Sequence, residues 1–430
     1  MNKKKMVILT LIITVLVLSS FLLTASSKKE AGGKLFSGQT INIAMIDEPR
    51  EQVLKDWTSE FEELYGAEVV VDLLGFEPLT TKTLTASQGK TGEYDIMQIA
   101  SQTLPLYIEA GWLFDLKDWV ERDEEEVQPE DIHPVILDRA YLILNGGWWG
   151  MPMHVNSHAF FYRKDIFNEM GFDPPTDWKD TIQKAEAINN KYAPDLYGIT
   201  FMGAPDIQLG AEFTTVIASL GGYFYDKNYN PSVNSPTGRE AMEIFQELTK
   251  HAPPGVTGYA LDENYNAFAQ GKAAMCTAWT TGTYFFGDPE KSKVSDKWEV
   301  MSMPGGHAIL GMWAMTISEY SKQKEAAWAW LKWATSLEME KRLLGNMETP
   351  RLTLLRDPDI QEEYPNNKAF LLALETDPTS WPRVAPLEMV GKAAIVTNEV
   401  LTETKTPAEG AKELDEIVRE ILVNHGYLDE

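Results

Sequence analysis

Three polar residues, His154, Asn156 and His158, alternate with other residues in the segment 153–162. This alternation is typical of a strand and would place all three side chains on one face, where two imidazoles could bind one metal ion. A zinc site normally has three or four ligands, and no cysteine or carboxylate at the usual spacing completes this set. We therefore expect no metal here; hydrogen bonds to the backbone or to a small ligand are the alternatives.

Carboxylates are the other abundant reactive groups. The chain has 64 acidic residues, and two carboxylates on either side of a sugar could hydrolyse a glycosidic bond. Abundance alone does not identify such a pair. The chain contains no GxSxG elbow, HExxH helix, Walker loop or GxGxxG helix start, which excludes several enzyme classes. A secreted glycoside hydrolase is the enzymatic alternative that these observations leave open.

The first 27 residues predict export from the cytoplasm. Lysines occupy positions 3–5, an almost wholly apolar run covers 6–23, and small residues follow at Ala25 and Ser27. This is the layout of a secretory signal peptide with cleavage ahead of Lys28. The apolar run is also close to the length that spans a bilayer, so an uncleaved membrane anchor is the alternative. Residues 28–37 are expected to form a flexible leader.

Charge and cysteine content restrict the role of the exported part. Loss of the three lysines with the signal peptide changes the formal net charge from −26 to −29, which argues against binding to nucleic acid or anionic lipid. Cys276 is the only cysteine, so we expect an inert buried thiol. A lipid anchor on an N-terminal cysteine is excluded, which leaves a free periplasmic or extracellular protein, or one held by its uncut N-terminal segment.

Hydrophobic periodicity after residue 38 predicts alternating strands and helices, an α/β fold with largely parallel strands. Some 400 residues exceed what one core usually supports, so we expect two lobes. A continuous β-branched run at 68–74 predicts a strand covered on both faces. The remaining expected elements near the N-terminal half are strands at 40–46, 94–100 and 153–162, one helix at 50–64, and helices at 104–110, 164–170 and 177–189, the last capped by Thr176.

The order of several motifs resembles that of the extracellular solute-binding proteins of ABC importers, in the group that includes maltose-binding protein. The motifs are YDIMQIASQTLPLYIEAGWLFDL (94–116), GMPMHVNSHAFFYRKDIFNEMGFDPPTDW (150–178), FAQGKAAMCTAW (268–279), GMWAMTISEYSKQKEAAWAWLKW (311–333) and METPRLTLLRDP (347–358). The resemblance implies a two-lobed, type II-like periplasmic-binding-protein fold with a ligand cleft at the hinge. We expect lobe I to comprise 38–154 and 303–336, and lobe II to comprise 155–302 and 337–430.

Candidate ligand-binding residues follow from strand ends, where α/β proteins bind ligands, and from the resemblance. Gly311 to Trp313 is expected in a loop before the Trp-rich helix, and the two arginines match places where relatives bring a side chain to the cleft. The full set is Asp47, Glu48, Ser101, Gln102, His154, Asn156, Trp279, Trp313, Arg351 and Arg383. With 13 tryptophans and 16 tyrosines, the chain has enough aromatic rings to pack on the apolar face of a sugar.

The resemblance implies a binding protein rather than an enzyme, one that captures a sugar or sugar alcohol and delivers it to an importer. The implied partners are the membrane-spanning permease subunits and a cytoplasmic ATPase. We expect a monomer with no cofactor. A non-sugar solute in the same fold is the second alternative.

Overall fold

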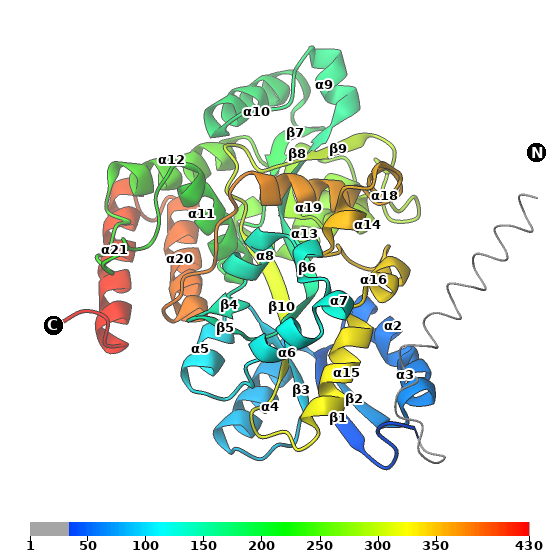
Figure 1. Ribbon diagram of the computed structural model, residues 1–430. Coiled ribbons are helices and arrows are strands. Elements are labelled where there is room, and N and C mark those ends of the chain that lie inside the picture. The colour runs from blue at the N-terminus through cyan, green and yellow to red at the C-terminus, as the bar shows by residue number, and fades with distance from the viewer. Residues whose placement is uncertain (1–33, 430) are drawn as a thin grey trace, which may run out of the picture.

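The computed structural model describes residues 34–429. The expected signal peptide at 1–27 and most of the leader therefore lie outside the described residues. The described chain forms two lobes, and strands run from one lobe into the other (Figure 1). The strands form one hydrogen-bonded path in the order β2-β1-β3-β10-β6-β8-β7, and β9 pairs with β6 beside this path.

The first lobe is built on three parallel strands, β1 (Thr40–Ile46), β2 (Glu68–Leu74) and β3 (Ile96–Ala100). Their carboxyl ends meet at one edge of the sheet, which faces the second lobe. The other elements of this lobe are α2 (Pro49–Asp56), α3 (Thr58–Tyr65), α4 (Phe76–Gln88), α5 (Leu104–Glu109), α6 (Lys117–Arg122), α7 (Glu124–Val127), η1 (Pro129–Asp131), α8 (Pro134–Arg139), β4 (Ile143–Leu144), β5 (Gly147–Trp148), α15 (Lys324–Ala334) and α16 (Leu337–Leu343).

Two strands, β6 (Met151–Arg163) and β10 (Leu310–Ile317), connect the lobes. β10 pairs antiparallel with β3 on one side and with β6 on the other. Further along, β6 pairs antiparallel with β8 (Ala273–Trp279) and β9 (Trp298–Met301) of the second lobe. One strand of 13 residues thus contributes to the sheets of both lobes.

The second lobe contains β8, β9 and a short strand parallel to β8, β7 (Tyr197–Thr200). Its helices are α9 (Lys164–Met170), α10 (Trp178–Tyr192), α11 (Ile207–Ser219), α12 (Pro236–Lys250), η2 (Val256–Gly258), α13 (Leu261–Ala269), α14 (Gly282–Phe286), α20 (Pro386–Leu401) and α21 (Pro407–Asn424). Between the lobes run α17 (Leu352–Leu355), α18 (Pro358–Glu363) and α19 (Pro365–Glu375). α19 packs along β6 (Figure 1). The expected two-lobed α/β architecture is confirmed.

Two large hydrophobic clusters form the cores of the lobes, and several segments belong to a different cluster from the one that the expected division gives them. Met339 of α16 belongs to the first cluster, as do Leu355 of α17 and Phe370 of α19, although the expected division places 337–430 in lobe II. α16 packs on α2, where Glu340 Oε1 lies 2.5 Å from Arg50 Nη2. Conversely, Ala308 and Ile309 belong to the second cluster, so the chain enters the first lobe only with β10.

Several local expectations were wrong for identifiable reasons. The helix expected at 50–64 is interrupted at Trp57, where Thr58 Oγ1 donates a hydrogen bond to the carbonyl of Lys55; such side-chain bonds compete with the helical pattern. The strand at 68–74 is an edge strand with Glu68 exposed, not one covered on both faces.

Two further corrections concern single side chains. Asp177, not Thr176, caps α10, and its carboxylate accepts a hydrogen bond from the backbone N–H of Asp180. At the end of the expected leader, Phe36 is buried and its N–H donates to the carbonyl of Tyr65 at 2.9 Å, so this residue is part of the folded lobe. No helix within residues 34–429 is both long and apolar enough to cross a membrane.

Gly210 of α11 allows this helix to approach α20 closely. A Cβ atom at Gly210 would lie 2.2 Å from the carbonyl oxygen of Val390, a backbone atom that cannot move aside easily. We expect Gly210→Ala to destabilise the second lobe by roughly 1–3 kcal/mol through overpacking, seen as a lower midpoint of thermal unfolding.

The neighbouring Gly391→Ala is the matched control. A Cβ at Gly391 meets no heavy atom within 4 Å, so the added methyl should be neutral or stabilise the helix by up to about 1 kcal/mol. Equal unfolding midpoints for the two variants would contradict the close packing of α11 on α20.

Candidate functional site

The candidate site lies on one face of the crossing strands. Because side chains alternate along a strand, His154, Asn156 and His158 share one face of β6. Their cross-strand partners project from the same face: Trp313 pairs with His154, and Gly311 pairs with Asn156, both from β10. The expectation that Trp313 lies in a loop is therefore corrected, because β10 extends through it.

Two half-buried indole rings stand at this face, one from each lobe. Trp279, the last residue of β8, is opposite His158, and their rings are 4.1 Å apart between centroids. Its Nε1 donates a hydrogen bond to Gln208 Oε1 at 2.7 Å, which fixes the ring. Phe76 packs against Trp313 in a T-shaped arrangement, with ring centroids 5.7 Å apart.

Gly311 brings these groups together. A Cβ atom here would lie 2.2 Å from Asn156 Oδ1 and 2.9 Å from Trp279 Cζ3. Only glycine therefore allows the amide and the indole to lie side by side over β10. Asn156 Oδ1 is buried and has no hydrogen-bond partner within residues 34–429, although such atoms nearly always have one in folded proteins. An unfilled acceptor beside a flat ring suits a ligand hydroxyl.

A polar network behind this face positions His154. The buried carboxylate of Glu51 lies 3.3 Å from His154 Nδ1 and accepts a hydrogen bond from Gln98 Nε2 at 2.8 Å. Gln98 Oε1 in turn accepts from the N–H of Ile46 at the end of β1. Burial raises the pKa of Glu51, but His154 and Gln98 outweigh it and hold the pKa below its usual range. Sequence reasoning missed Glu51 and Gln98; the one signal was a glutamine inside an otherwise apolar strand.

Asp47 and Glu48 follow β1, as expected, and their side chains reach solvent. Asp47 Oδ1 accepts a hydrogen bond from Gln52 Nε2 at 2.7 Å. Partial desolvation raises the pKa of Glu48, while the nearby His154 opposes this shift. The structure thus brings Glu48 to the same region as His154, on the first-lobe side.

Ser101, Gln102 and Arg383 lie at one end of this region. Gln102 and Arg383 line a cavity of 270 Å³ between α5 and the start of α20. Arg383 Nη2 donates to Glu109 Oε1 at 2.7 Å, so its charge is already paired. The N–H of Ser101 donates to the carbonyl of Met312, and its hydroxyl has no partner within the described residues.

The position of Arg351 differs from the expectation that it lines the ligand cleft. Its side chain is buried, and its guanidinium donates hydrogen bonds to the backbone carbonyls of Val127 at 2.8 Å, Gln128 at 3.1 Å and Thr335. These carbonyls lie near helix ends of the first lobe, where backbone oxygens lack helical partners. Arg351 therefore joins segments of the first lobe and does not face the candidate site.

The two histidines of β6 have different partners. Glu51 is the partner of His154, whereas His158 is fully buried and its Nδ1 lies 3.2 Å from Thr215 Oγ1. Burial lowers the pKa of His158 to about 3, so this ring is neutral. No group of three metal-ligating side chains occurs in the part of the chain that the structure describes.

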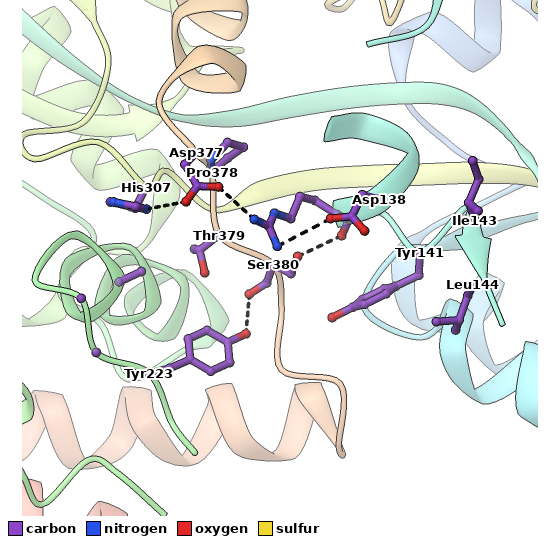
Figure 2. Close-up of a pocket in the computed structure, with 14 residues that line it drawn as sticks. Asp138, Tyr141, Ile143, Leu144, Tyr223, His307, Asp377, Pro378, Thr379 and Ser380 are labelled. Carbon is purple, nitrogen blue, oxygen red and sulfur yellow. Dashed lines mark hydrogen bonds and ion pairs between the residues drawn. The ribbon is translucent and has the colours of Figure 1, made fainter. Parts of the chain in front are cut away.

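A second hollow between the lobes lies beside the segment 377–380, which passes across the strand ribbons in Figure 2 and pairs with Ile309 through Thr379. It has a volume of 500 Å³ and contains none of the ten expected site residues. Its polar groups are largely satisfied by each other: Arg139 Nη2 lies 2.9 Å from Asp377 Oδ1, and the hydroxyl of Tyr223 donates to the carbonyl of Ser380 (Figure 2). This hollow therefore lacks the unfilled acceptor seen at Asn156.

Glu348 is buried, and its backbone pairs with that of Val155 in β6 through an isolated antiparallel β-bridge. Burial raises the pKa of Glu348 to about 7, whereas the pKa of a free glutamate is about 4.3. At a pH between these two pKa values, the side chain of Glu348 is protonated in the folded protein and deprotonated in the unfolded chain. Stability should therefore fall as pH rises through this window.

Glu348→Gln should remove the part of this pH dependence that comes from Glu348. We expect the variant to be more stable than the parent by roughly 3–4 kcal/mol at pH 8 and equally stable near pH 4, measured by thermal unfolding across pH. Glu416→Gln, on the exposed surface of α21, is the control and should leave the pH profile unchanged. A gain at pH 4 as large as at pH 8 would contradict the assignment.

Comparison with known proteins places these features in context. An ABC transporter solute-binding protein from Agrobacterium radiobacter, solved in complex with ribitol, is 27% identical and superimposes with a TM-score of 0.77 over 90% of this chain and 100% of that one. An erythritol/L-threitol-binding protein of Mycolicibacterium smegmatis is 25% identical over 72% of this chain and 70% of its own length. A probable amino-acid ABC transporter periplasmic-binding protein of Sinorhizobium fredii is 24% identical over 92% of each chain.

The likeness to the ribitol complex confirms the two-lobed periplasmic-binding-protein fold. The sequence model of the bacterial extracellular solute-binding proteins matches residues 47–341, which is more than half of the chain. That match runs from the residue after β1 into α16 and so includes both crossing strands and most of the candidate site. The chain belongs to the family of bacterial extracellular solute-binding proteins.

Proposed function

We propose that this chain is the extracytoplasmic substrate-binding component of an ABC importer, which binds a neutral sugar alcohol or sugar between its lobes. The observation that carries the proposal is the pairing of the half-buried rings of Trp279 and Trp313 with Asn156, whose side-chain oxygen has no partner within residues 34–429. Indole faces pack on the apolar C–H groups of a polyol, and an amide exchanges hydrogen bonds with its hydroxyls. The ribitol complex and the erythritol/L-threitol-binding relative support the same class of ligand.

The charges around the site favour a neutral solute over an amino acid. An amino acid or sugar acid carries a carboxylate, whose usual partner is an arginine or lysine. Arg50 is buried and bound to Glu340, and Arg383 is bound to Glu109. The carboxylates of Glu48 and Glu51 lie near His154, and Asp47 lies near Glu48, so this side of the site would repel an anion. These charges make an amino acid, which the name of one relative suggests, the second candidate for the ligand.

We further propose that the protein performs no chemistry on its ligand, works outside the cytoplasm as a monomer, and delivers the ligand to membrane-spanning permease subunits. Family membership supports a binding role. The carboxylates of Asp47 and Glu48 are adjacent on one side of the site, whereas a glycosidase needs two that flank the sugar.

A thermal-shift screen tests the class of ligand. We expect a sugar alcohol or sugar among erythritol, ribitol, D-mannitol and maltose to raise the unfolding temperature, because a ligand at 100 times its Kd stabilises the folded state by about 2.7 kcal/mol. Leucine and glutamate should have no effect. Stabilisation by an amino acid alone would contradict the proposal, and so would conversion of maltose to glucose on prolonged incubation.

Gly311→Ala tests the site itself. The added methyl would push Asn156 or Trp279 aside, so we expect the Kd for the stabilising polyol to rise at least tenfold, equivalent to about 1.4 kcal/mol, by isothermal titration calorimetry. Trp279→Ala should weaken binding at least as much. The control is Gly391→Ala, whose Cβ meets open space and which should bind as the parent does; an unchanged Kd in Gly311→Ala would reject this face as the binding site.

A further inference from the structure

The side chain of Gln208 lies at the edge of the indole ring of Trp279, although Gln208 was not among the ten expected site residues. Gln208 is the second residue of α11, and its Oε1 accepts a hydrogen bond from Trp279 Nε1 at 2.7 Å. Both residues are partly exposed. A solute that packs on the indole would therefore also meet the carboxamide of Gln208.

The indole determines how this carboxamide is oriented. An indole N–H can only donate a hydrogen bond, so Gln208 must present its oxygen to Trp279, and its amide nitrogen is left for another partner. Gln208 Nε2 donates to no other group within residues 34–429. It is also not among the side-chain atoms of these residues that are both buried and unpartnered. The N–H groups of Nε2 are therefore unpaired and accessible to solvent.

Two further contacts hold Gln208 against β8. Its backbone N–H donates to Oδ1 of Asp206, the capping residue of α11, at 2.8 Å. One turn further along α11, the carboxylate of Glu212 accepts a hydrogen bond from Thr277 Oγ1. Thr277 lies on the same face of β8 as Trp279, because side chains alternate along a strand. A carboxamide held in this way loses little freedom when a ligand binds.

Asn156 carries a second carboxamide beside this indole. A Cβ atom at Gly311 would lie 2.2 Å from Asn156 Oδ1 and 2.9 Å from Trp279 Cζ3. Cζ3 belongs to the six-membered ring of the indole, whereas Nε1, beside Gln208, belongs to the five-membered ring. The two carboxamides therefore lie at opposite ends of one flat aromatic group, which suits a solute with several hydroxyls along its length.

The unpaired nitrogen of Gln208 restricts what can bind at its end of the indole. Nε2 only donates hydrogen bonds, so the ligand must present an acceptor there. A hydroxyl oxygen meets this requirement and can still donate to another group. An ammonium group has no lone pair to accept the bond, so this end of the site disfavours the amino group of an amino acid.

We propose that Gln208 is a specificity-determining residue of the site between the lobes, where its Nε2 donates a hydrogen bond to a hydroxyl of the ligand. Trp279 has two roles in this arrangement: its ring packs against the C–H groups of the ligand, and its N–H holds the carboxamide of Gln208 in the donating orientation. The inference rests on the proposed function, because it names a further ligand contact at the same site.

Gln208→Glu tests this contact. The variant keeps an oxygen for Trp279 Nε1 but has no N–H to donate, so at pH 8 we expect the Kd to rise at least tenfold in isothermal titration calorimetry. The probe is whichever of erythritol, ribitol, D-mannitol and maltose binds the parent most tightly. At pH 4, below the pKa of about 4.3 for a free glutamate, the protonated carboxyl regains an O–H donor, and the Kd should come within about threefold of the parent's at that pH.

Gln183→Glu, on the exposed surface of α10, is the matched control. It adds the same charge to the second lobe away from the indole and should bind as the parent does at both pH values. An unchanged Kd for Gln208→Glu at pH 8, or an equal loss of affinity at pH 8 and pH 4, would overturn this inference while the proposed function stands. If none of the four probes bound the parent, the proposed function and the inference would both fail.

Discussion

The arrangement of this protein depends on one strand that belongs to two lobes. β6 pairs with β10 on one side and, beyond the crossing point, with β8 and β9, so its backbone groups are bonded on both sides of the junction. Because side chains alternate along a strand, one face of β6 packs into the hydrophobic core through Met153 and Val155. The other face carries His154 and Asn156 towards the space between the lobes. A shift in register by one residue would exchange the two faces and bury the polar residues.

Buried polar side chains hold the polar face of β6 in place. Gln98 links the end of β1 to Glu51, and Glu51 lies against the ring of His154. These contacts join β3, β1, α2 and β6, so the orientation of His154 is fixed by three other elements. A side chain held in this way loses little freedom when a ligand binds, which favours affinity.

Paired charges shape the chemistry of the region as much as polar contacts do. Arg50 and Arg383 form ion pairs with Glu340 and Glu109. Arg351 donates hydrogen bonds to backbone carbonyls. What remains is the neutral amide of Asn156 near the ring of Trp279 and the carboxylates of Glu48 and Glu51 near His154. Such a surface suits hydroxyl groups and excludes anions, in line with the strongly negative net charge of −26 for the whole chain.

Features that depend on neighbouring residues could be predicted from the amino-acid sequence. The strand at 40–46 and the helix at 164–170 lie where the pattern predicts them, because hydrophobic period and helix signals act over a few residues. The order of motifs predicted the family, and the ends of β1, β3 and β8 predicted the positions of Glu48, Gln102 and Trp279 in the structure.

Contacts between distant segments of the chain could be identified only in the folded protein. Arg351 resembles a ligand contact in sequence, yet its partners are carbonyls more than 200 residues away at Val127 and Gln128. The roles of Gly311 and Glu51 also follow from neighbours on other strands, and a glycine or a glutamate has no local pattern that reveals them. The register and packing of remote segments decide these contacts, and short-range preferences in the chain do not encode them.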